Sequence, residues 1–282
     1  MTTREWTCEA AATKRSGTGC GSSIGVSPRP MIQSAPAAWK KESRGIENSV
    51  LGVLLHDAVA RGDALEASDL LRKDANPDHC RDSGKITPLM LAISSIRRDL
   101  VRLLLDAQAD PTKKDADGLD AMDRLALAEE RLCARSEGIE RRMTGISELL
   151  QRDGAAMTRR EKELKLAELG SGQEELDDTI KLQNECQAIG KMIEKKLDAI
   201  LLEAAQSDDL ERAVAAIEAG ADPISFDREG RSPYLVARDR GFAGLAAYLK
   251  KDLDENLASL MDGGSQDEIM AALRAGAEPI KQ

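Results

Sequence analysis

One four-residue pattern recurs four times in this chain of 282 residues and always ends in Pro. Its second residue is always Ala, and its third is Asp, Asn or Glu. Pro cannot continue a helix, and Gly or a similar residue in the first position is typical of a chain leaving one. The pattern therefore predicts four helix ends, at Asp74–Pro77, Gln108–Pro111, Gly220–Pro223 and Gly276–Pro279.

A second pattern predicts helix starts, in which a hydroxyl residue caps the helix and Pro occupies its first turn. It occurs as Thr-Pro-Leu-Met-Leu-Ala at Thr87–Ala92 and as Ser-Pro-Tyr-Leu-Val-Ala at Ser232–Ala237. Thr87 precedes Pro111 by 24 residues, and the other units keep this spacing. Units starting at Thr87 and Asp120 lie 33 residues apart. We therefore expect helix pairs starting near Val53, Thr87, Asp120, Ala199, Ser232 and Glu255.

This period, with its Thr-Pro-Leu and Gly-Ala-Asp patterns, resembles the ankyrin repeat. Asp115–Gly118 and Asp227–Gly230 match the family's turn. The resemblance implies short paired helices that must stack, because none is stable alone.

The chain also departs from the family pattern. Thr and His never share one repeat, so the family's usual hydrogen-bond pairing is absent. Gln108 and Asp74 replace the Gly that ends the outer helix, at a cost if φ is positive there. Only 23 residues separate Ser232 from Glu255, so that repeat should lack its outer turn.

The middle of the chain has a different composition. No Pro occurs between Pro111 and Pro223, and apolar residues recur at heptad spacing, as in a coiled coil. One stripe is Leu125, Leu132, Ile139, Met143, Ile146, Leu150, Met157 and Leu164, and a second is Leu182, Cys186, Ile189, Ile193 and Leu197. Gly170–Gly172, followed by a Ser171–Glu174 capping box, predicts the turn between them. The two arms either pack on each other, which we favour, or offer a seam to a partner.

The predicted fold is all-α: an ankyrin-like solenoid of helix pairs with an inserted antiparallel helical hairpin. Residues 1–45 are rich in Ser, Gly and Pro and are expected to be a disordered tail. Ankyrin-like repeats follow at 46–123 and 199–282, and the hairpin occupies 124–198. One continuous, bent stack is favoured over two stacks joined by the hairpin.

Composition excludes several classes of function. Fifty acidic against 40 basic residues give a net charge of −10, which argues against nucleic-acid binding. No apolar run is long enough to cross a bilayer. Five Cys, an odd number at unrelated spacings, fit a reducing compartment. We expect an intracellular protein, most simply cytoplasmic, although residues 1–45 are poor in acids and permit an organellar transit peptide.

No catalytic set is predicted. His56 lies among apolar neighbours and fits a structural role, while His79 and Cys80 are adjacent in a turn and should not face each other. No spacing typical of a zinc site occurs. The sequence therefore predicts no catalytic, cofactor-binding or metal-binding residue, and no cofactor.

The remaining candidate for function is the concave face of the stack. The resemblance implies that contacts come from turn tips and inner helices, here Arg61, Ser83, Ser94, Ser95, Arg228, Glu229, Arg231, Asp239 and Arg240. The leading hypothesis is a non-catalytic adaptor or scaffold that binds a protein partner there. The alternative is a structural subunit of a large assembly, docked through the hairpin and tail.

Overall fold

The computed structural model describes residues 37–80 and 84–278, and within them all regular structure is helical. The chain divides into two compact units, residues 1–42 and 43–282. Of the first, only the start of helix α1 (Ala37–Arg61) is described. Residues 37–45, which the sequence analysis assigned to the tail, are thus helical, because Ala, Lys and Glu there favour a helix. Residues 1–36 lie outside the described part.

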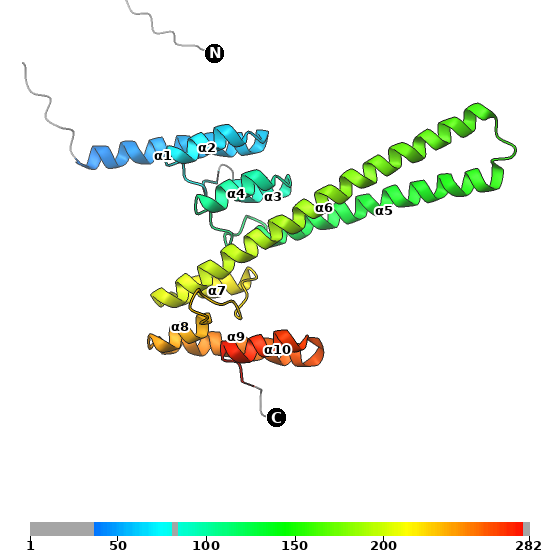
Figure 1. Cartoon of the computed structure of the whole chain (residues 1–282). Helices are drawn as coiled ribbons and strands as arrows, with labels where there is room; N and C mark the ends of the chain where they lie inside the picture. The colour runs from blue at the N-terminus through cyan, green and yellow to red at the C-terminus, as the bar shows by residue number, and fades with distance from the viewer. Residues whose placement is uncertain (1–36, 81–83, 279–282) are drawn as a thin grey trace, which may run out of the picture. The chain divides into compact units, whose positions relative to one another are not determined.

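Short helix pairs build the second unit as predicted (Figure 1). After α1 come α2 (Ala64–Arg72), α3 (Pro88–Ser94) and α4 (Arg98–Asp106). Near the C-terminus follow α7 (Leu210–Glu218), α8 (Pro233–Asp239), α9 (Ala243–Gly263) and α10 (Gln266–Ala275). Thr87 and Ser232 cap α3 and α8 with their hydroxyl groups, and Pro follows each, as the sequence predicts.

The four predicted helix ends adopt one geometry. Asp74, Gln108, Gly220 and Gly276 have φ of 62°, 65°, 99° and 106°. After each of these residues an Ala turns inward and is buried. The Ala amide donates to a carbonyl of the preceding helix, for example from Ala109 to Leu104 at 2.9 Å and from Ala221 to Ala216 at 2.9 Å. The repeated sequence therefore encodes a repeated helix end, and the small Ala lets the chain turn against the core.

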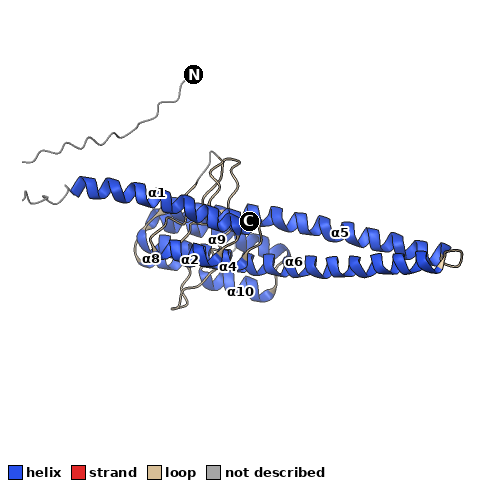
Figure 2. Cartoon of the chain, turned by 90° about the horizontal axis from the view of Figure 1, so that it is seen from above, coloured by secondary structure: helices blue, strands red, loops and turns tan. Residues whose placement is uncertain are grey.

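Two long helices, α5 (Ala121–Asp153) and α6 (Arg159–Ser207), form the antiparallel hairpin (Figures 1 and 2). Asp120 caps α5 in a capping box with Asp123, at the predicted start of the third repeat. The predicted turn at Gly170–Gly172 is wrong, because these residues lie inside α6. The turn instead follows Asp153 and ends at Thr158, which forms a capping box with Glu161.

The glycines of α6 have another role. A Cβ at Gly172 would lie 2.9 Å from Met143 Cγ, and one at Gly190 would lie 3.2 Å from Leu125 Cδ2. Both glycines allow α6 to approach α5 closely. The predicted first stripe also ends early, since Met157 lies in the turn and the side chain of Leu164 is 61% exposed.

The hairpin is an extension of the third repeat. The start of α5 packs on α3, and α6 packs on α4, on α7 and on α8. The segment of α6 near Ile193 thus serves as the outer helix of the third repeat, and the segment from Ala199 onward serves as the inner helix of the fourth. Helix α6 continues without a turn between these two segments.

Helix α9 repeats this arrangement. It packs on α8 and α10 and replaces the outer turn that the sequence analysis found missing. Four fully buried apolar side chains at a spacing of four line each helix: Ile189, Ile193, Leu197 and Leu201 in α6, and Leu245, Leu249, Leu253 and Leu257 in α9. Val53, Ala199 and Glu255 therefore lie inside helices α1, α6 and α9 and do not begin them.

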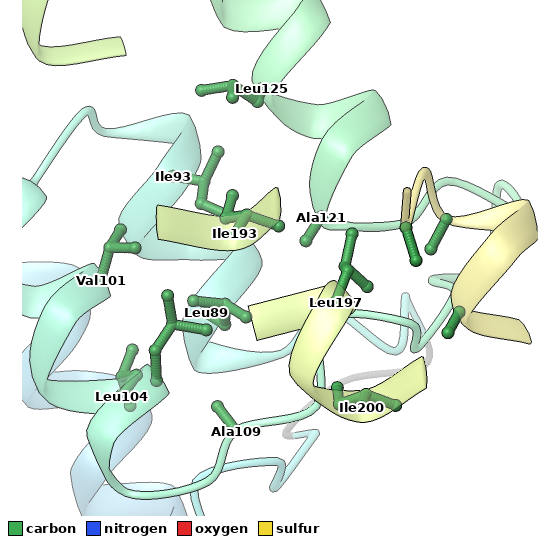
Figure 3. Close-up of a cluster of buried hydrophobic side chains, with 14 of the residues drawn as sticks. Leu89, Ile93, Val101, Leu104, Ala109, Ala121, Leu125, Ile193, Leu197 and Ile200 are labelled. Atoms are coloured by element: carbon green, nitrogen blue, oxygen red, sulfur yellow. The ribbon is translucent and has the colours of Figure 1, made fainter. Parts of the chain in front are cut away.

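One apolar cluster runs from Leu55 of α1 to Leu249 of α9 and passes through the base of the hairpin. Figure 3 shows its central part, where side chains of α3, α4, α5 and α6 meet. The cluster includes Leu125 and Leu132 of α5 but none of the residues around the hairpin turn. The two repeat segments thus share a core.

Truncating Leu104 to Ala should lower the free energy of unfolding by about 2–5 kcal/mol, because its side chain is fully buried between helices. Leu65→Ala is the control, since Leu65 is 82% exposed and its loss should change stability by about 0.5 kcal/mol or less. Chemical denaturation measures both. A loss under about 1 kcal/mol for Leu104→Ala would place α4 outside the core.

Gly170→Ala should raise the free energy of unfolding by about 0.5–1 kcal/mol, because Gly170 lies inside a helix with open space around it. Gly172→Ala should raise the free energy of unfolding by less, because the added Cβ would lie too close to the Met143 side chain. The same denaturation experiment compares them. If Gly170→Ala instead lowered the free energy of unfolding, the hairpin turn would lie at residues 170–172, as the sequence analysis predicted.

Candidate functional site

The predicted contact residues do not form one site. Arg228, Glu229 and Arg231 line a common cavity of about 430 Å³. Arg61 ends α1 and forms an ion pair with Glu66. Ser94 donates its hydroxyl to the Met90 carbonyl oxygen at 2.9 Å, and Ser95 caps the end of α3. Ser83 lies outside the described residues.

The cavity lies between the turn before α8 and the part of α6 that forms the inner helix of the fourth repeat. From α6 it is lined by Ala199, Leu202, Glu203 and Gln206, and from the turn by Phe226, Asp227, Arg228, Glu229 and Arg231. The two walls thus come from the inner helix and the turn tip, the positions that the ankyrin resemblance implies.

Asp227 organises the turn. Its Oδ1 accepts hydrogen bonds from the backbone amides of Glu229 at 2.8 Å and Arg231 at 2.9 Å. Its Oδ2 accepts from Nε and Nη2 of Arg231 at 3.1 and 3.0 Å. These bonds, chiefly that from the Arg231 amide, hold the pKa of Asp227 below its usual value against the opposing effect of burial. Gly230, with φ of 76°, permits the tight return.

The same turn occurs before α5, where Asp115 accepts from the amides of Asp117 and Leu119 at 2.8 and 3.0 Å. Arg124 of α5 binds its other oxygen. Burial raises the pKa of Asp115, but Arg124 and the amides outweigh it, and the pKa is lowered overall. The Asp and Arg of both turns are therefore structural, and Arg231 is not a free contact residue.

Only some of the side chains that line the cavity are available to contact a partner. Arg228 is exposed and, within the described residues, forms no hydrogen bond or ion pair. Phe226 is 41% exposed, which is unusual in a chain with only 2% aromatic residues. Sequence reasoning missed Phe226, although an aromatic residue directly before the Asp-Arg-Glu-Gly turn was a usable signal. Leu202, Glu203 and Gln206 were missed because Ala199 was taken as a helix start.

Asp239 and Arg240 lie at the end of α8 and bind within the protein. Arg240 Nη1 donates to the Gln206 carbonyl oxygen at 2.6 Å, which ties α8 to α6. Asp239 accepts from Arg238 at 3.0 Å, and the Arg238 guanidinium lies 5.8 Å from the ring centroid of Tyr234. Arg240 thus contacts the inner-helix end at Gln206, and neither predicted residue lines the cavity.

The other titratable groups serve packing. Burial raises the pKa of Asp198, whose Oδ1 accepts from the Asp222 amide at 2.8 Å and so joins α6 to the turn after α7. Burial also raises the pKa of the Cys186 thiol, which lies in the core. The side chain of His79 lies against Gly52, and His56 is half-buried on α1.

Among residues 37–80 and 84–278, no three His, Cys, Asp or Glu side chains are grouped to hold a metal ion. No helix in the described part of the chain combines the length and apolar character needed to cross a membrane.

Comparison with known proteins agrees with the repeat geometry. Residues 85–116, which contain α3 and α4, match the family model of the ankyrin repeat. The chain thus contains an ankyrin repeat, and its fold is an ankyrin-like solenoid, which confirms the prediction. A segment of 61 residues, 22% of the chain, is 39% identical to the 2-5A-dependent ribonuclease of Mus musculus. The match spans only 8% of that protein.

Replacing Asp227 with Asn should reduce stability at pH 6 but not in strong acid. The folded pKa of Asp227 lies below the usual 3.8, so its charge stabilises the fold above pH 3.8, and this contribution is lost as the pH falls further. The difference in unfolding free energy between wild type and Asp227→Asn should therefore shrink below about pH 3.8. Denaturation at several pH values measures it.

Asp262→Asn provides the control, because Asp262 is exposed at the end of α9 and no hydrogen bond or ion pair involves it in the described structure. Its difference from wild type should stay small at each pH. A pH-independent effect of Asp227→Asn would show that the Asp227 charge does not support the turn.

Proposed function

We propose that this protein is a non-catalytic interaction module that binds a protein partner through the cavity between α6 and the turn before α8. Ankyrin repeats are protein-interaction modules, which supports protein binding in general. The carrying observation is the exposed Phe226, held by a turn fixed through Asp227 beside Arg228, which pairs with no residue in the described part of the chain. Aromatic and Arg side chains are enriched among residues that contribute most to binding.

The charge of the site favours a protein over a nucleic acid. Arg228 stands beside Glu229 and Glu203, so the cavity has mixed signs. The chain as a whole carries −10. A partner with a small apolar anchor and both charge signs would complement this surface better than a uniform polyanion.

An intracellular location is part of the proposal. Cys80, Cys133 and Cys186 are free thiols in the structure, and an odd total of five fits a reducing compartment. The cytoplasm is the simplest compartment, and residues 1–45, which are poor in acids, permit import into an organelle as the alternative.

The alternative, a structural subunit of a large assembly, is supported by the outer half of the hairpin. A cavity of about 640 Å³ lies there along Met143, Ile146 and Leu149, and Leu164 and Leu166 are exposed nearby on α6. Such an apolar surface suits permanent burial. Size-exclusion chromatography of the free chain distinguishes the two, since a stable monomer favours the adaptor and instability alone favours the subunit.

Phe226→Ala and Arg228→Glu should each reduce recovery of the partner at least tenfold in affinity capture from the native cell, because they remove the anchor and the free charge. Melting temperatures should remain near that of wild type, since neither side chain is in the core. Arg131→Glu is the matched control, because Arg131 is an exposed cation of α5 outside the cavity. Equal recovery of all proteins by wild type and both cavity variants would reject this site.

A further inference from the structure

A second cavity, of about 590 Å³, lies between the outer helix α4 and helix α6. Its α4 wall is formed by Arg98, Asp99, Arg102, Leu105 and Asp106, its α6 wall by Met192, Lys195, Lys196 and Ala199, and Gln108 after α4 also lines it. Apart from Ala199, none of these residues lines the cavity of the proposed function. We call this surface the α4–α6 groove.

Each wall of the groove is formed by one face of a helix. Arg98, Arg102 and Leu105 are spaced by four and three along α4, so they share one helix face. Met192, Lys195, Lys196 and Ala199 likewise share one face of α6. The groove is therefore a seam between two helices, with a cationic rim on each side and an apolar strip formed by Leu105, Met192 and Ala199 between them.

Much of the positive charge in the groove is uncompensated. Within the described residues, Arg102 and Lys195 form no ion pair or hydrogen bond. Arg98 lies 3.6 Å from Glu185 in an exposed pair, which is worth little in water. Lys196 donates to the neutral Gln108 Oε1 at 2.6 Å, which leaves its charge available. A local excess of cations is unusual in a chain of net charge −10.

Gln108 follows α4 and connects the end of this helix to the groove. It occupies a left-handed backbone position with φ of 65°, as Asp74, Gly220 and Gly276 do at the corresponding repeat ends. Here the side chain holds Lys196 at the groove.

Two acidic side chains in the groove determine which kind of anionic partner can bind there. Asp99 and Asp106, seven residues apart on α4, interrupt the cationic rim. A nucleic acid or polyphosphate would place negative charge against them. An amphipathic helix can instead place its carboxylates opposite Arg102 and Lys195 and not opposite the two Asp side chains. Its apolar side chains can then lie opposite Met192 and Leu105.

We propose that the α4–α6 groove docks an acidic amphipathic helix of a partner protein. Its leucine-like side chains cover the apolar strip, and its Asp or Glu side chains pair with Arg102 on one rim and Lys195 on the other. This docking is separate from binding at Phe226.

The test uses a phage-displayed random peptide library selected on the whole chain. Counter-selection uses the double variant Arg102→Glu/Lys195→Glu. The peptides recovered should carry Asp or Glu together with apolar residues at helical spacing. Their affinity, measured with synthetic labelled peptide by fluorescence anisotropy, should fall at least tenfold in the double variant and should weaken with added salt.

Three matched variants complete the design. Arg131→Glu/Arg160→Glu changes the net charge equally at exposed cations outside the groove and should bind as wild type does. Arg102→Lys/Lys195→Arg keeps both charges and should retain binding. Phe226→Ala should also retain it, which separates this docking from the proposed function.

Other outcomes overturn the proposal. These are a recovered pool without acidic amphipathic peptides, an equal loss of affinity in the charge-matched variant outside the groove, and displacement of the peptide by tripolyphosphate at stoichiometric concentration. The last would assign the groove to a free polyanion.

Discussion

The structure depends on apolar contact between neighbouring short helices. Helices such as α3 and α8, with seven residues each, cannot persist alone, because helix nucleation is too costly for so few hydrogen bonds. Leu89 and Ile93 of α3 are fully buried only because α4, α5 and α6 surround them. Each repeat thus needs its neighbours, and the buried cluster that joins α1 to α9 follows from this requirement.

This requirement also fixes the backbone at the repeat ends. The chain must leave each outer helix sharply enough to start the next pair, which places Asp74 and Gln108 in the left-handed region. The turn is then held from the residue before the start of the same repeat: Asp198 and Asp254 accept the amides of Asp222 and Glu278 at 2.8 and 2.7 Å. Polar contacts therefore set the register, while apolar contacts supply most of the stability.

The sequence predicted this part of the fold well, because its signals are local. Thr87, Asp120 and Ser232 cap helices as expected, and the Pro patterns mark real helix ends. The prediction failed where a glycine had a tertiary reason to be present. Gly172 was taken for a turn residue, but it is required by the approach of Met143 across the hairpin, which no local pattern reveals.

The candidate sites were harder to predict for the same reason. Arg231 and Arg240 have the composition of contact residues, but Asp227 and the Gln206 carbonyl oxygen occupy them. The α4–α6 groove escaped notice because its walls come from Arg102 and Lys195, which are far apart in the sequence and meet only when α6 acts as an outer helix. Residue type alone cannot distinguish a paired surface cation from a free one.

The hairpin shows why such a stack tolerates a large insertion at this position. The two helices of a repeat are antiparallel and adjacent, so lengthening both leaves their bases unchanged and disturbs no neighbouring repeat. Leu125 and Ile193 pack in the common core, whereas Leu164 lies outside it. Because α6 continues unbroken from the hairpin past Ala199, one helix supplies a wall to the α4–α6 groove and to the cavity at Phe226. The insertion therefore extends the helix on which both proposed binding surfaces are built.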